Sequence, residues 1–186
     1  AATRLLENSE LATITLAALS QRTSKMRLGI AVVLAPMHHP LNVAVRMATQ
    51  DILSRGRVDL GVGRSGYPYQ IGAYGVDLKD ARGMMYETLS IIPRVWTEDV
   101  FSHHGKYYDL PPRVPYRGYQ LEELTLVPRP RHLPVECWQP IQSASQRGLD
   151  FMAKHRIKGI LGGGVAEGGA MHDVIERYRD ALVRTG

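Results

Sequence analysis

Short apolar runs alternate with longer stretches of helical periodicity along this chain. Residues 27–34 and 57–62 are rich in Val, Leu and Ile, which is typical of strands buried on both faces. Between them, apolar residues recur at helical spacing after Pro40, and Gly56 follows as a helix stop. The pattern predicts a strand–helix–strand unit with parallel strands and a right-handed crossover.

The same alternation continues toward the C-terminus, with further apolar runs and further amphipathic stretches. Strands that alternate with helices are typical of an α/β fold, whose chemistry gathers beyond the carboxyl ends of the strands. We therefore expect four core strands in all. The further predicted strands cover residues 135–141 and 157–161, and the further predicted helices cover residues 9–24, 78–96, 143–155 and 170–184.

Two stretches depart from this alternation. Residues 64–77 are polar and rich in Gly and Tyr, and we expect a loop there. Residues 100–130 are divided by prolines and aromatic residues into short extended pieces, which predicts hairpins or an excursion from the main fold. Long excursions in a compact domain are often functional.

Composition narrows the function classes. The 186 residues, 44% of them hydrophobic, suffice for a sizeable core and about one domain. The net charge of +5 is dispersed, which fits a solvated surface or an anionic ligand and argues against nucleic acid. Cys137 is the only cysteine, so no intramolecular disulfide forms and a reducing compartment is indicated. With no signal-peptide pattern and no apolar run of about 18 residues, we expect a cytoplasmic protein without membrane spans.

Three polar positions beyond the predicted strands could bind a phosphate. Arg64 follows the second strand, where a guanidinium can make two charge-assisted bonds to an anion. Arg82 lies early in the next helix, where the helix dipole disfavours a cation that has no nearby anion. Ser143 precedes a helix and its free N–H groups. An exposed arginine or an ordinary helix cap explains each of them about equally well.

Other candidate chemistry is sparse. His38 and His39 follow the first strand, where solvated loop histidines are the favoured interpretation and a general base is the alternative. No group of His, Cys and carboxylate residues has the spacing of a metal site. The sequence also has no nucleophile elbow, no phosphate-binding P-loop and no strand–GxGxxG–helix fingerprint.

Three stretches, in order, carry a family resemblance. They read RLGIAVVLAPMHHPLNVA, ILSRGRVDLGVGRSG and YGVDLKDARGMMYETLSIIPRVWT. Together they resemble the bacterial luciferase-like, flavin-dependent monooxygenases, from about Ser9 to the C-terminus. The resemblance implies a TIM barrel, which has eight β/α units. We therefore expect residues 1–186 to be a single partial barrel domain with about four units and an excursion at about 100–130.

The resemblance also implies roles for individual residues. The pair Ala31-Val32 matches one that often forms a non-prolyl cis peptide beneath the flavin ring, and Gly63 matches a position where a small residue leaves room at the reactive edge. Two tyrosines are expected to line the substrate pocket. The implied residues are Arg64, Arg82 and Ser143 for the flavin phosphate, Ala31, Val32 and Gly63 for the ring, and Tyr67 and Tyr69 for the pocket.

Two features depart from the family pattern. Gln142 stands where the family often has a carboxylate, so that contact is in doubt. A Glu-His-His motif that carries the catalytic histidine in luciferase is absent and is expected ahead of Ser9. The chain is then part of a longer polypeptide, which we favour, or half of a two-chain barrel, or a shortened relative.

The implied activity is oxygenation by FMN. A separate reductase would supply reduced FMN, and O₂ would provide the oxygen atom inserted into a small organic substrate. One alternative is an oxidoreductase of the same superfamily that uses the deazaflavin F420 for hydride transfer. Another is a non-catalytic flavin-binding or scaffold protein. A homo- or hetero-oligomer is expected, because four barrel strands leave two edges unpaired.

Overall fold

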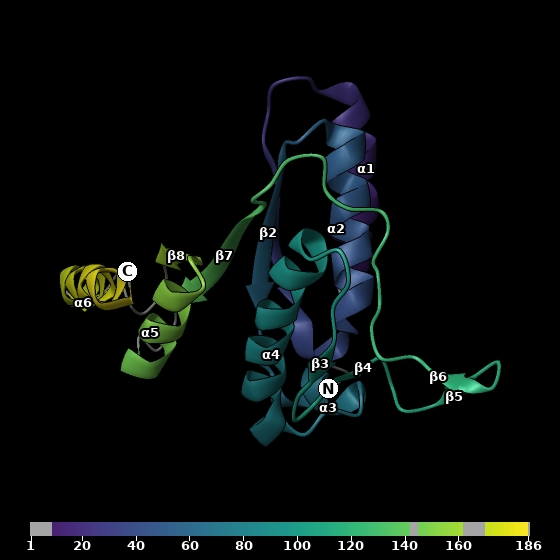
Figure 1. The fold of residues 1–186 in the computed structure, drawn as a ribbon. Helices are drawn as coiled ribbons and strands as arrows, with labels where there is room; N and C mark the ends of the chain where they lie inside the picture. The colour runs from purple at the N-terminus through teal and green to yellow at the C-terminus, as the bar shows by residue number, and fades with distance from the viewer. Residues whose placement is uncertain (1–8, 142–144, 162–169, 186) are drawn as a thin grey trace, which may run out of the picture.

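The computed structural model describes residues 9–141, 145–161 and 170–185 and is built around one parallel sheet (Figure 1). The strand order is β1-β2-β7-β8. The strands are β1 (Leu28–Leu34), β2 (Val58–Gly63), β7 (Glu136–Ile141) and β8 (Lys158–Leu161). The four predicted core strands are therefore present and parallel, with bounds that differ by a residue or two.

Helices follow the strands as the alternation predicts. They are α1 (Ser9–Arg22), η1 (Ala35–Met37), α2 (Pro40–Ser54), α3 (Pro68–Ala73), α4 (Leu78–Thr97), α5 (Gln146–Lys154) and α6 (Ala170–Thr185). In Figure 1, α1, α2 and α4 lie beside β1 and β2, and α5 and α6 lie beside β7 and β8. The loop predicted at residues 64–77 is wrong in part, because Pro68 begins the short helix α3 there. None of the helices in the described ranges is long and apolar enough to cross a membrane.

Helix α2 ends as the glycine signal predicts, with Ser54 as its last residue, Arg55 as its C-cap and Gly56 just beyond. Arg55 already adopts a left-handed conformation with φ of 60°, and Gly56 follows with φ of 83°. The Gly56 N–H donates to the carbonyl of Asp51 at 2.8 Å, which closes the last turn. An imidazole nitrogen of His132 lies 2.0 Å from the place of a Gly56 Cβ, so the position has no room for a side chain.

One face of the sheet is covered and the other is open. Leu28, Ile30 and Val33 of β1 are buried, whereas Gly29 and Ala31 between them are exposed. Strands β7 and β8 are only half buried. The prediction that the strands are buried on both faces holds for β2, in which every residue except the half-buried Asp59 is buried. It is wrong for β1, β7 and β8, because among the described residues the helices pack on one face only. The exposed face corresponds to the interior of a closed barrel.

The covered face holds the core. Side chains from β1 and β2 pack against α2 and α4, and the indole N–H of Trp96 donates to the carbonyl of Ala44 at 3.1 Å, joining these two helices. Pro93 does not end α4, which continues to Thr97. The largest fully buried side chains include Met47, Leu60, Ile71, Leu89, Ile91 and Ile92.

The segment between α4 and β7 leaves the main fold and returns. It forms two small hairpins, β3 (His103–His104) with β4 (Asp109–Leu110), and β5 (Pro115–Tyr116) with β6 (Tyr119–Gln120). The predicted hairpins are confirmed. On its return the chain crosses the end of α2, where the buried Asp51 carboxylate accepts the N–H groups of Arg131 at 2.6 Å and His132 at 3.0 Å.

We expect Asp51→Ala to lower the free energy of unfolding by about 2–3 kcal/mol, because two charge-assisted hydrogen bonds to the returning segment are lost. Urea unfolding followed by circular dichroism measures this. The control is Asp99→Ala, which removes a side chain that is 98% exposed and paired with Arg129. It should cost less than about 1 kcal/mol, and equal losses in the two variants would contradict the role given to Asp51.

Candidate functional site

A bulge lies at the carboxyl half of β1. Ile30 pairs with Leu60 and Val33 pairs with Val62, so Ala31 and Val32 together oppose the single residue Gly61. The peptide bond between Ala31 and Val32 is cis, as the resemblance implies. Bulges of this kind re-aim a strand and are common beside active sites.

Glycine at position 61 is required by this bulge. A Cβ at Gly61 would lie 2.0 Å from the carbonyl oxygen of Ile30, which is backbone and cannot rotate away. Sequence analysis missed this residue, although a glycine inside a strand signals close backbone approach. A Cβ at Gly63 would lie 2.6 Å from a methyl group of Val32. Packing therefore already explains Gly63, and its predicted role at the flavin edge stays a prediction.

A tight turn follows β2 and presents Arg64. Ser65 adopts a positive φ of 77°, and its hydroxyl donates to the Gln70 side-chain oxygen at 2.8 Å and accepts the Tyr67 N–H at 3.1 Å. These bonds link the turn to the start of α3. The Arg64 guanidinium is half-buried and forms no hydrogen bond or ion pair within the described ranges. It is therefore available for an external anion.

Arg82 is the fifth residue of α4, which begins at Leu78 as the sequence predicts. Asp77 caps α4 through a hydrogen bond from the Lys79 N–H to its carboxylate at 3.0 Å, and Asp80 occupies the first turn. Arg82 therefore falls in the second turn, and the argument from the helix dipole was wrong for it. Its side chain is exposed and, like Arg64, has no polar partner in the part of the chain described here.

The two pocket candidates lie side by side on the surface. The rings of Tyr67 and Tyr69 are 5.6 Å apart, tilted by 35°, and the residues are 60% and 49% exposed. They follow the Arg64 turn directly. Ser143 falls outside the described residues. Its neighbour Ser145 occupies the cap position of α5 without a side-chain capping bond.

His39, the second of the two histidines after β1, has a structural role. Nδ1 of His39 accepts the Leu41 N–H at 3.3 Å and caps α2, and the ring meets the edge of Tyr108 at 5.7 Å between centroids. Burial lowers the pKa of His39 below its usual value, so the neutral form prevails at pH 7. Because Nδ1 accepts a bond, the proton of that form lies on Nε2. His39 therefore presents a donor, which fits a general base poorly, and His38 lies half-buried beside it.

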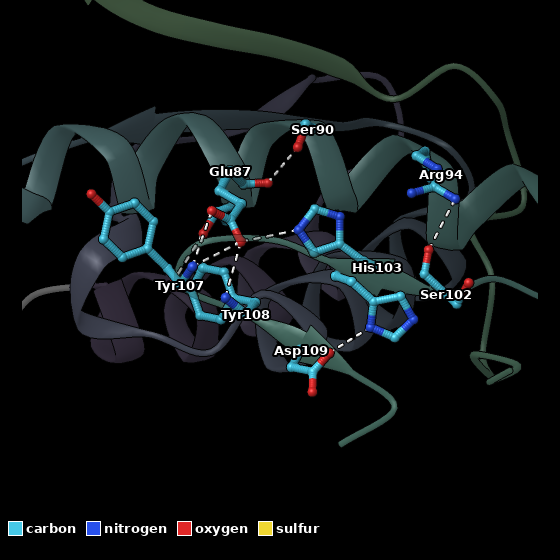
Figure 2. A network of polar contacts seen from close by, with 10 residues as sticks. Glu87, Ser90, Arg94, Ser102, His103, Tyr107, Tyr108 and Asp109 are labelled. Atoms are coloured by element: carbon cyan, nitrogen blue, oxygen red, sulfur yellow. Dashed lines mark hydrogen bonds and ion pairs between the residues drawn. The ribbon is translucent and has the colours of Figure 1, made fainter. Parts of the chain in front are cut away.

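A carboxylate on α4 that is only 12% exposed, that of Glu87, holds the first hairpin (Figure 2). Glu87 contacts Nε2 of His103 at 3.0 Å and accepts the N–H groups of Tyr107 at 3.2 Å and Tyr108 at 2.9 Å. One turn earlier, Gly83 leaves room for the Tyr107 ring, whose hydroxyl donates to Asp80 at 2.9 Å. The hairpin thus lies along one stripe of α4 and brings Tyr108 to His39.

Sequence analysis did not find this contact. Its signal is the spacing of Asp80, Gly83 and Glu87, which places two carboxylates and a glycine on one face of a helix.

Neither a reactive cysteine nor a metal site is found among the described residues. Burial raises the pKa of the Cys137 thiol to about 12, so it stays protonated and unreactive. Within the described ranges, no cluster of three or more His, Cys, Asp or Glu residues could hold a metal ion.

The chain is similar in sequence to a known protein family and to several named monooxygenases. A family model described as luciferase-like monooxygenase matches residues 5–186. The oxygenase component of the flavin-dependent trigonelline monooxygenase of Acinetobacter baylyi is 32% identical over 100 residues, which are 53% of this chain and 28% of that protein. Limonene 1,2-monooxygenase of Rhodococcus erythropolis is 40% identical over 80 residues, which are 43% of this chain and 21% of that protein.

Solved structures show the same fold. Monooxygenase RslO1 from Streptomyces bottropensis superposes with a TM-score of 0.81 at 23% identity, over 94% of this chain and 50% of that one. The oxygenating constituent of 3,6-diketocamphane monooxygenase of Pseudomonas putida, solved with FMN, gives 0.77 at 22% identity, over 100% of this chain and 51% of that one. This chain thus spans about half the length of these solved relatives and a smaller share of the curated ones. The predicted partial TIM barrel is confirmed.

We expect Gly61→Ala to lower the free energy of unfolding by about 3 kcal/mol or more, because the new methyl group meets the Ile30 carbonyl. Gly72→Ala is the control: Gly72 lies in α3 with nothing within 4 Å of its Cβ position. That change should stabilise slightly, by about 0.5–1 kcal/mol. Urea unfolding distinguishes the two, and a neutral Gly61→Ala would refute the bulge argument.

For Glu87→Ala we expect faster hydrogen exchange at the amides of Tyr107 and Tyr108, whose acceptor is removed. Glu98→Ala removes another carboxylate near α4, one that pairs with Arg94 and contacts neither amide. Protection at the two tyrosine amides should be unchanged in that control. Exchange that accelerates equally in both variants would mean that Glu87 does not hold the hairpin.

Proposed function

The chain belongs to the luciferase-like monooxygenase family, and on this basis we propose that it forms the phosphate side of an FMN site in a flavin-dependent monooxygenase. The observation that carries the proposal is the pair of arginines that have no counter-charge among the described residues. Arg64 extends from the turn at the carboxyl end of β2, where ligands of parallel β/α folds bind. Arg82 lies in α4, which packs against β2.

The residues present fit a flavin mononucleotide. An unpaired guanidinium suits a phosphate dianion, because it can form two parallel charge-assisted bonds. The exposed Ala31, in the bulge, offers a small and apolar surface against which a flat ring can rest. We assign Arg64, Arg82 and Ser143 to the phosphate and Ala31, Val32 and Gly63 to the ring, with Tyr67 and Tyr69 beside the substrate.

FMN and the protein would contribute different parts of the reaction. FMN supplies the redox chemistry with O₂ when it is bound. This chain positions the phosphate with its arginines, and the bulged strand fixes the backbone beneath the ring. The hairpin held by Glu87 places Tyr108 against His39 beyond the end of β1, where the two rings help to exclude water from that side of the site.

Further features of the reaction complete the proposal. One relative is named as an oxygenase component, which supports a separate reductase as the source of reduced FMN. The relatives named as flavin-dependent favour FMN over F420. The substrate is a small organic molecule, and residues 1–186 act as one barrel unit in a cytoplasmic, oligomeric enzyme. Of the two candidate bases, His39 fits poorly, because its Nδ1 caps α2, and His38 stays the candidate.

We expect Arg64→Gln to weaken FMN binding about 10–100-fold, the loss of one charge-assisted phosphate contact of about 1.5–3 kcal/mol. Riboflavin binding should hardly change, because riboflavin lacks the phosphate. Fluorescence titration of both ligands measures the effect. The control is Lys25→Gln, which removes a cation ahead of β1, at the opposite end of the sheet.

Three results would count against the proposal. Equal loss of FMN and riboflavin affinity in Arg64→Gln would mean that the arginine does not bind the phosphate. Loss of FMN affinity in Lys25→Gln would point to a general effect of charge. Binding of F420 in preference to FMN would support the deazaflavin alternative in place of the monooxygenase.

A further inference from the structure

The second hairpin stands apart from the rest of the chain. Its strands β5 and β6 are joined by Arg117 and Gly118, both with positive φ, at 50° and 87°, as a two-residue hairpin turn requires. Every residue from 112 to 120 is exposed, and Figure 1 shows the hairpin well away from the sheet and its helices. An isolated two-stranded hairpin is only marginally stable in water, so this arm is expected to gain order from a partner.

The two edges of this arm differ. In a two-residue hairpin the residues that flank the turn, here Tyr116 and Tyr119, exchange hydrogen bonds with each other. The backbone groups of the next pair therefore point outward. On the β5 side that residue is Pro115, which has no N–H to donate. On the β6 side it is Gln120, whose N–H and C=O both face the free edge.

We propose that this edge is a dimer interface, in which β6 of one chain pairs antiparallel with β6 of a second copy about a two-fold axis at Gln120. The register follows from the axis. Gln120 faces its own counterpart, so the outward N–H and C=O of the two residues satisfy each other. Tyr119 then faces Leu121 of the partner subunit, which forms an apolar cross-strand pair.

The charges of the arm support a second copy of the chain as the partner. The same register brings Arg117, at the turn, next to Glu123 of the partner subunit, and the two-fold axis repeats the contact. The basic tip and the acidic base of the arm are thus self-complementary, which is what an interface between identical surfaces needs. An interface of this small size implies a weak dimer, in which the charges decide register more than affinity.

Cysteine crosslinking tests the register. Gln120→Cys places two thiols opposite each other across the axis, and mild oxidation should convert most of the protein to a disulfide-linked dimer on a non-reducing gel. Arg113→Cys is the matched control, because it introduces an equally exposed thiol on the other side of the same arm. It should crosslink far less. Equal crosslinking of both variants, or none for Gln120→Cys, would overturn the proposal.

A charge exchange tests the interface without oxidation. Glu123→Arg should weaken dimerisation about ten-fold in sedimentation equilibrium, and adding Arg117→Glu in the same chain should restore it. Val183→Ser, which alters a residue of α6 that is 84% exposed, should leave the dimer unchanged. A wild-type protein that stays monomeric at high concentration would refute the proposal, whether the arm is free or packs against another part of a longer protein. Neither experiment depends on flavin binding.

Discussion

The close approach of β1 and β2 at Gly61 determines the geometry of the candidate site. Two residues of β1 oppose one of β2, and the carbonyl of Ile30 occupies the space that any side chain at position 61 would need. The same bulge places Val32 over Gly63 and leads the chain directly to the Arg64 turn. The bulge in β1 therefore requires glycine at positions 61 and 63.

The arginines of the chain divide into two groups. Arg57 donates to the carbonyls of Ser20 and Met26 and joins α1 to the sheet, and Arg27 pairs with Asp59. These guanidinium groups are already satisfied and serve the fold. Arg64 and Arg82 have no such partners within the described ranges. This contrast, more than the net charge, is what points to an anionic ligand.

The segment between α4 and β7 has two parts with different physical roles. The hairpin held by Glu87 is packed on α4 and ordered by partly buried polar contacts, so it belongs to the body of the fold. The second hairpin has no comparable contact with the rest of the described chain and exposes Tyr116 and Tyr119. The first part is suited to shape a site, and the second is suited to meet another molecule.

The sequence alone determined the order and type of the main elements, because hydrophobic periodicity and the Pro and Gly signals act locally along the chain. It also indicated Arg64 and the cis pair Ala31-Val32, the latter only through resemblance. Tertiary structure decided the rest. The ring contact of His39 with Tyr108, the demand for glycine at Gly61 and the bonds from Glu87 to the first hairpin each depend on atoms from a distant segment, which spacing cannot reveal. Tertiary structure also decided which face of the sheet is buried. The strands are apolar enough for both faces, but the core of this chain lies on the face that the helices cover.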